Sequence, residues 1–204
     1  MAFHDEPCPA GPSDFEEVIE VGGSPVTIRP ISPSDGPGLV AFHASLTSWS
    51  IYLRYFGAHP RLSDREVEKF THVDHRDRLA LVAESEGGIV GVGRYDRVAG
   101  GAEAEVAFVV ADAFQGRGIG TVLLHRLAES AKRNGIRWFV ADVLAENRVM
   151  LDVFAQSGFE VHFSACHEVV HVTFDIEGGP GPEGRHGARR VLADAQVEHP
   201  GSSR

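Results

Sequence analysis

Cysteine is scarce in this sequence, which contains only Cys8 and Cys166 among its 204 residues. Two cysteines so far apart lack the close spacing of a zinc site, and they cannot form the disulfide framework of a small secreted domain. The sequence therefore predicts a protein of a reducing compartment, and we expect the cytoplasm.

Long apolar runs and an excess of basic residues are also missing. No stretch approaches the roughly 18 apolar residues of a membrane helix, and the N-terminus lacks the pattern of a secretion signal, so we expect no membrane association. The formal net charge of -10 argues against a nucleic-acid partner, because phosphate binding needs clustered Lys and Arg. Six of the acidic residues lie within residues 1–24, which leaves the remainder only mildly acidic.

A chain of this length can hold one well-buried domain but hardly two. Residues 1–24 and 175–204 are rich in Gly, Pro, Ser and charge, so they offer little apolar surface to bury. We predict an acidic disordered leader over 1–24, a single domain over 25–174 and a disordered tail over 175–204.

Hydrophobic periodicity within this domain predicts an α/β (α+β) fold in the order β-α-α-β-β-β-α-β-α-β-β. A capping box formed by Ser63 and Glu66 begins the second helix. Residues 50–57 are predicted to be an aromatic-rich connection. The predicted strands are 26–29, 79–84, 89–95, 103–110, 138–143, 159–163 and 169–174, and the helices lie within 35–46, after 63, within 119–133 and within 147–156.

The stretch QGRGIG at residues 115–120 lies between a predicted strand and a predicted helix. Such a loop presents free backbone N–H groups and the positive end of the helix dipole, which together bind phosphate. The glycines let the backbone approach a ligand closely, and polar side chains add hydrogen-bond donors. The predicted anion-binding residues are Gln115, Gly116, Arg117, Gly118, Ile119, Gly120 and Thr121.

The glycine spacing excludes two common nucleotide sites. A dinucleotide fingerprint needs G-x-G-x-x-G, whereas the third glycine here comes one residue early. A P-loop needs a Lys after its last glycine, and Thr121 stands there instead. The three glycines alone also fit a simple tight turn, so the adjoining sequence decides between a turn and a ligand site.

The strand at 105–110 (EVAFVV), the glycine loop, Asn147 and the pair Gly158-Phe159 together resemble the GNAT N-acetyltransferase superfamily. The resemblance runs over about residues 25–174, and the Q-x-x-G-x-G loop is its most specific part. It implies a mixed, mostly antiparallel central sheet whose fourth and fifth strands splay apart, flanked by about four helices. It also implies acetyl-CoA as co-substrate and no metal.

The resemblance assigns a role to each part of this region. It implies that the loop binds the coenzyme A pyrophosphate and that the pantetheine arm pairs with the backbone of Phe108, Val109 and Val110. It also implies that Asn147 contacts the pantetheine or the leaving thiol.

Glu105 is the candidate general base. It precedes the strand residues that would hold the pantetheine, on the same face as Ala107 and Val109. Apolar surroundings should raise the pKa of its carboxyl toward neutrality, which suits a base that deprotonates an amine. A Glu at this position of the fourth strand is the usual base in many GNAT proteins. The alternative is a purely structural carboxylate paired with a neighbouring Arg.

Other candidates for chemistry are weaker. Many GNAT proteins carry a Tyr general acid in the helix after the fifth strand, where this sequence has Phe154, so the general acid is not identified. We interpret residues 72–75 (HVDH) as a solvated charged loop rather than a metal site. Cys166 is predicted to be a packing residue, because direct transfer needs no acyl-enzyme.

Residues 52–57 (YLRYFG), 104–108 and 145–147 further resemble the catalytic domain of bacterial protein lysine acetyltransferases. This implies a protein substrate with an exposed lysine, acyl-CoA synthetases being the known target class. Acidic residues at 64, 66 and 68 suit a lysine among basic neighbours. Two alternatives stay open, namely acetylation of a small-molecule amine and a non-catalytic coenzyme A sensor.

Overall fold

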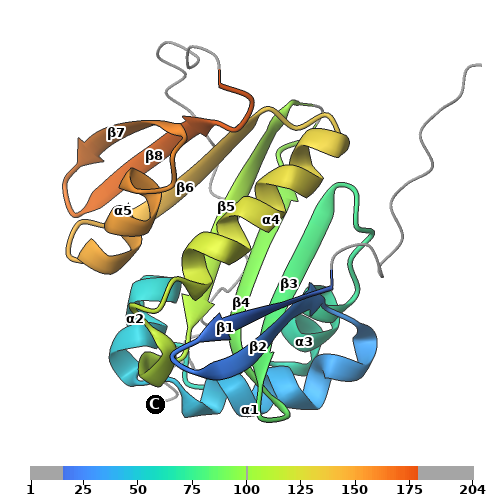
Figure 1. Ribbon diagram of the computed structural model, residues 1–204. Coiled ribbons are helices and arrows are strands. Elements are labelled where there is room, and N and C mark those ends of the chain that lie inside the picture. The colour runs from blue at the N-terminus through green and yellow to red at the C-terminus, as the bar shows by residue number, and fades with distance from the viewer. Residues whose placement is uncertain (1–15, 100, 179–204) are drawn as a thin grey trace, which may run out of the picture.

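The computed structural model describes residues 16–99 and 101–178. In this part of the chain eight strands form one sheet in the order β1-β2-β3-β4-β5-β6-β8-β7 (Figure 1). Neighbouring strands are antiparallel except β5 and β6, which are parallel. The strands are β1 (Glu17–Val21), β2 (Ser24–Pro30), β3 (Arg78–Ser85), β4 (Gly88–Arg97), β5 (Glu103–Val110), β6 (Trp138–Leu144), β7 (Glu160–Cys166) and β8 (Val169–Asp175).

Helices cover the two faces of this sheet. Because side chains alternate along each strand, the sheet supplies one core to each face. Leu81 and Phe108 pack with α4 on one face, whereas Val82 and Val109 pack with α1 and α3 on the other. The helices are α1 (Gly36–Ser45), α2 (Ser48–Tyr55), α3 (Asp64–Thr71), α4 (Ile119–Arg133) and α5 (Arg148–Ala155), with short 3₁₀ helices at Pro33–Asp35 and Asp112–Phe114.

The predicted splay of two strands is confirmed. β5 pairs with β6 only from Glu103 to Glu105, opposite Trp138 to Val140. Beyond Glu105 the strands separate, while β5 stays paired with β4 as far as Val110. Within the described residues, the far half of β5 therefore keeps one edge without a neighbouring strand, in the middle of the sheet.

The predicted leader is wrong for its last residues, because the sheet begins at β1. The strand forms a hairpin with β2 through Gly22 and Gly23, whose φ values of 60° and 85° suit a two-residue turn. Val21 is buried, and Glu17 forms an ion pair with Arg126 of α4 (2.7 Å). At the other end Ile176 is also buried, so the domain extends past residue 174. Residues 1–15 and 179–204 of the predicted leader and tail lie outside the described residues.

The aromatic-rich connection predicted at 50–57 is largely the helix α2. Aromatic and β-branched residues have modest helix propensity, which hides this helix in the sequence. Its N-terminus is capped by Thr47, whose side chain accepts a hydrogen bond from the Ser50 backbone N–H (3.2 Å). Ile51 and Tyr55 then pack against the core beneath α1 and α3. The capping box predicted at Ser63 and Glu66 is confirmed at the start of α3.

We expect Gly93→Ala to destabilise the fold. Gly93 of β4 faces Phe108 across the strand pair, and a Cβ atom there would lie 2.8 Å from the Phe108 ring and 3.2 Å from the Leu123 Cβ. Relief of such a clash in a packed core costs about 1–3 kcal/mol of unfolding free energy. Chemical denaturation measures this, with Gly57→Ala as control because no atom lies within 4 Å of its added Cβ. Equal stability of the two variants would contradict this view of the β4–α4 contact.

Candidate active site

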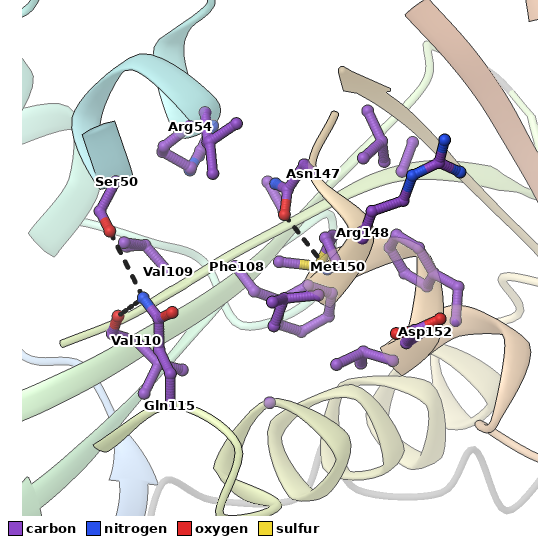
Figure 2. Close-up of a pocket in the computed structure, with 18 of the residues that line it drawn as sticks. Ser50, Arg54, Phe108, Val109, Val110, Gln115, Asn147, Arg148, Met150 and Asp152 are labelled. Carbon is purple, nitrogen blue, oxygen red and sulfur yellow. Dashed lines mark hydrogen bonds between the residues drawn. The ribbon is translucent and has the colours of Figure 1, made fainter. Parts of the chain in front are cut away.

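A cavity of about 560 Å³ opens where β5 separates from β6. Its wall is built from β5, the glycine loop, the first turn of α4, β6, α5 and the inner side of α2 (Figure 2). This volume lies in the usual range for small-molecule sites. The predicted residues that line it are Glu105, Phe108, Val109, Val110, Gln115, Gly116, Gly118, Ile119, Gly120, Thr121 and Asn147.

Arg117 is the predicted ligand that does not line the cavity. Its side chain is exposed, and its guanidinium carbon lies 5.5 Å from the centroid of the Phe114 ring. From this position it flanks the loop rather than the cavity. A contact with an outlying phosphate of the ligand stays a prediction.

The glycine loop has the geometry of an anion cradle. Gly116 and Gly118 have φ values of 69° and 87°, a region that favours glycine. Gly118 is the N-cap of α4, and no side chain caps that end of the helix. The first residues of this 15-residue helix line the cavity, so the positive end of the helix dipole lies at the cavity wall. The loop fits a pyrophosphate.

Gln115 holds the loop in place. Its side-chain amide donates to the Val110 carbonyl (2.9 Å) and lies 3.4 Å from the Ser50 hydroxyl (Figure 2). The sequence predicted this amide as a ligand donor, whereas in the structure both contacts are within the protein. Gln115 thus links the end of β5, the loop and α2.

Asp112 makes a second link that the sequence analysis missed. Its carboxylate accepts hydrogen bonds from the hydroxyls of Thr47 (2.9 Å) and Ser50 (2.8 Å). These bonds attach the start of α2 to the end of β5, and they lower the pKa of the Asp112 carboxyl against the effect of burial. The only local sequence signal was the capping pattern of Thr47 and Ser50.

Asn147 begins α5 at the opposite wall. Its side-chain oxygen accepts a hydrogen bond from the Met150 backbone N–H (3.2 Å), which fixes the orientation of the amide (Figure 2). Among the described residues the amide nitrogen has no hydrogen-bond partner, and Asn147 lines the cavity. The same bond explains why α5 starts here.

Glu105 lies on the cavity wall at the last position of β5 that pairs with β6. It stands opposite Asp96 of the neighbouring strand β4, and the guanidiniums of Arg94 and Arg54 lie nearby. Burial raises the pKa of its carboxyl, and the two arginines oppose that rise. The expected raised pKa is therefore confirmed in direction, and the carboxylate stands beside two cations rather than in purely apolar surroundings.

A family model for the acetyltransferase (GNAT) family matches residues 46–159, more than half of the chain. The chain belongs to the GNAT acetyltransferase family. The match includes α2, β5, the glycine loop and α5, which are the elements that build the cavity. The resemblance and the fold class predicted from the sequence are thereby confirmed.

Several individual acetyltransferases are similar to this GNAT domain. The crystal structure of the GNAT domain of S. lividans PAT superposes with a TM-score of 0.76 at 38% identity, over 81% of this chain and 99% of that one. An acetyltransferase of Pseudomonas aeruginosa is 30% identical over 141 residues, 67% of this chain and 76% of that protein. Acetyltransferase Pat of Mycolicibacterium smegmatis is 31% identical over 134 residues, which are 64% of this chain but 40% of Pat.

Phe154 stands where many GNAT proteins carry a Tyr general acid, and in this GNAT domain its ring packs in the core. Phe154 of α5 is buried, with its ring 6.2 Å from that of Phe108 and 5.4 Å from that of Phe174. It closes the apolar back of the cavity and carries no proton to donate. A general acid at this place is therefore excluded.

The structure also describes the weaker candidates, which are the loop at residues 72–75 and Cys166. Asp74 accepts hydrogen bonds from the backbone N–H groups of residues 76, 77 and 78, so the loop after α3 is a capped turn. Among the described residues no group of three or more His, Cys, Asp or Glu side chains is arranged to hold a metal. None of the helices in residues 16–99 and 101–178 is long and apolar enough to cross a membrane. The prediction for Cys166 is wrong, because it is exposed at the end of β7.

We expect Glu105→Gln to stabilise the fold near neutral pH. A carboxyl whose pKa is raised by folding stabilises the protein fully below its unfolded pKa, and that stability is lost as pH rises through the folded pKa. The neutral amide does not undergo this loss. Thermal melts across pH should therefore show an advantage for the variant at neutral pH that shrinks as pH falls toward 4.5, the ordinary Glu value. A constant difference at all pH values would argue against a raised pKa.

Proposed function

We propose that this domain transfers the acetyl group of acetyl-CoA to lysine side chains of proteins, with Glu105 as the general base. The observation that carries the proposal is the position of Glu105. Glu105 lines the cavity at the point where β5 leaves β6, and Arg54 of α2 lines the same cavity. A donor bound along β5 and an acceptor entering beside α2 would meet there.

The residues of the chain fit acetyl-CoA as the donor. The backbone amides around Gly116 and Gly118 would hold the pyrophosphate at the start of α4. The unpaired edge of β5 along Phe108, Val109 and Val110 would hydrogen-bond the amides of the pantetheine arm as a further strand does. Thr121 and Asn147 supply polar groups from the two walls.

The reaction needs a neutral amine. At neutral pH, deprotonating a lysine of pKa about 10.4 costs about 4–5 kcal/mol. Glu105 would accept the amine proton as the nitrogen bonds to the acetyl carbon and the carbon–sulfur bond breaks. The thioester supplies the activated acetyl group, and coenzyme A leaves as a thiol that takes its proton from Glu105 or water. Its pKa, close to that of a Cys thiol, makes a dedicated acid unnecessary.

A protein acceptor is supported by the surface of α2. Trp49 lies at the cavity wall with 52% of its surface exposed, and it stacks on Tyr52 with 5.4 Å between ring centroids. The carboxylate of Glu146 lies near the Tyr52 hydroxyl and raises the pKa of that phenol. Exposed aromatics beside an acidic group suit a basic protein surface around a target lysine. The similarity to Acetyltransferase Pat and to the GNAT domain of S. lividans PAT also supports this choice of acceptor.

Mass spectrometry of acetylated lysines tests this function. The purified protein and its Glu105→Gln variant are incubated with acetyl-CoA and a bacterial extract, and separately with a purified acyl-CoA synthetase. Sites acetylated by the unaltered protein and absent with the variant support the proposal. Turnover restricted to polyamines or amino sugars would favour the small-molecule alternative. Coenzyme binding without thiol release across a broad amine panel would favour the sensor.

A further inference from the structure

Two arginines, Arg54 and Arg94, lie near Glu105 at the inner end of the cavity. Arg54 of α2 lines the main cavity and also a second, smaller one of about 40 Å³. The two cavities share Arg54, Ala107 and Val109, and Arg94 of β4 lines the inner one. Since a water molecule needs roughly 10–15 Å³ measured in this way, the inner space accommodates a group of a few heavy atoms.

Arg94 shares its carboxylate with another arginine. Arg78 forms an ion pair with Asp96 at 2.9 Å, which leaves Arg94 a longer contact of 3.5 Å with the same carboxylate. The guanidinium of Arg94 is therefore not held by a close ion pair.

Arg54 also lacks a close anionic partner among the described residues. In the part of the chain that the structure describes, its guanidinium forms no hydrogen bond or ion pair, and its carbon lies 5.2 Å from the centroid of the Tyr55 ring. The Arg94 Nε likewise has no hydrogen-bond partner among the described residues. Burial lowers the pKa of Arg54, so its surroundings disfavour the charge that it retains.

We propose that Arg54 and Arg94 form a carboxylate-binding subsite beside Glu105, which selects a substrate whose carboxylate lies a few bonds from the reacting group. A guanidinium in a confined space binds a carboxylate through paired, charge-assisted hydrogen bonds. Glu105 is not a permanent partner, because a base becomes neutral when it accepts a proton. An acetyl group bears no carboxylate, so the anion must belong to a dicarboxylic acyl donor or to the amine acceptor.

This inference rests on the part of the proposed function in which Glu105 promotes acyl transfer to an amine, and it replaces either the acetyl donor or the protein lysine by a substrate that carries a carboxylate. A dicarboxylic acyl chain would extend from the thioester past Glu105 into the inner space. An amine acceptor would instead place its own carboxylate there and its nitrogen next to Glu105. In both cases the guanidinium groups bind a carboxylate. Matched pairs of charged and neutral probes show whether it belongs to the acyl donor or to the amine acceptor.

Two probe pairs test the subsite. Succinyl-CoA is compared with butyryl-CoA, which has a chain of equal length, on a fixed lysine peptide. With acetyl-CoA as donor, 4-aminobutyrate is compared with its neutral amide. The ratio of kcat/KM for the charged and neutral members is measured by thiol release. We expect a preference of about tenfold or more for the charged member of one pair, since hydrogen bonds between charged groups contribute about 1.5–3 kcal/mol.

Variants of Arg54 test whether the preference for the charged probe depends on this side chain. Arg54→Gln should abolish the ratio and Arg54→Lys should restore part of it, whereas Arg65→Gln on the exposed side of α3 should leave the ratio unchanged. A ratio near one in both pairs, or a preference that survives Arg54→Gln, would overturn the subsite. Ligand-induced thermal shifts with the same probes, those of the amine pair measured with coenzyme A present, give a second readout that needs no turnover. A charged-probe preference in binding without any transfer would retain the subsite and refute the proposed function.

Discussion

Glu105→Gln is expected to lower kcat for lysine acetylation by roughly 10²–10⁴-fold, the usual contribution of a positioned acid–base group. The amide has nearly the same size as the carboxylate, so the KM for acetyl-CoA should change little. The pH profile of the unaltered enzyme should rise through the raised pKa of Glu105, because only the ionised carboxylate accepts the amine proton. Steady-state thiol release across a pH series measures both effects, and the variant should lose this limb of the profile.

Glu103→Gln supplies the matched control. Glu103 lies two residues earlier on β5, on the same face, and does not line the cavity. Its substitution changes charge and size in the same way and should leave kcat within a few-fold. Full turnover of Glu105→Gln at neutral pH, with coenzyme binding unchanged, would remove Glu105 from the mechanism.

Gly118→Val is expected to raise the KM for acetyl-CoA by a factor of ten or more, which corresponds to about 1.4 kcal/mol of binding free energy. Gly118 has a φ of 87° at the N-cap of α4, where a β-branched residue is strongly disfavoured. The loop must change its conformation to accept valine, and the amides at the helix start then no longer converge. Calorimetric titration with coenzyme A measures the binding loss directly.

The control for this loop is Gly87→Val. Gly87 has a similar φ of 78° in the turn between β3 and β4, and it does not line the cavity. Both substitutions should cost stability through the same backbone strain. Only Gly118→Val should weaken coenzyme binding, and an equal loss in the two variants would contradict a cradle at residues 115–120.

The parts of the site that were predictable from sequence depend on local patterns. The glycine loop combines a strand, a helix start and glycines in adjacent residues, so its place between β5 and α4 was predictable from the local sequence. Strand alternation likewise placed Glu105 on the same face as Ala107 and Val109. The charged surroundings of Glu105 were not predictable, because Arg54 comes from α2 and Arg94 from β4.

The sequence analysis missed α2 and β1 because each depends on contacts with another part of the chain. α2 is helical because Thr47 caps it and because Asp112, far along the chain, holds its first turn. β1 carries two glutamates in five residues, and composition concealed a hairpin that the Gly22-Gly23 turn marks. In both cases contacts with another part of the chain outweighed the average composition of the segment.

The separation of β5 from β6 would make a ligand bound along β5, as proposed, a structural component of the domain. Such a ligand would hydrogen-bond to the edge of β5 that no described strand occupies, so its binding energy would add to the stability of the folded state. At a free concentration one hundred times its dissociation constant, such a ligand contributes about 2.7 kcal/mol. The lifetime of the protein in a cell would then follow the supply of its acyl donor, and starvation for that donor would first appear as faster turnover of the enzyme itself.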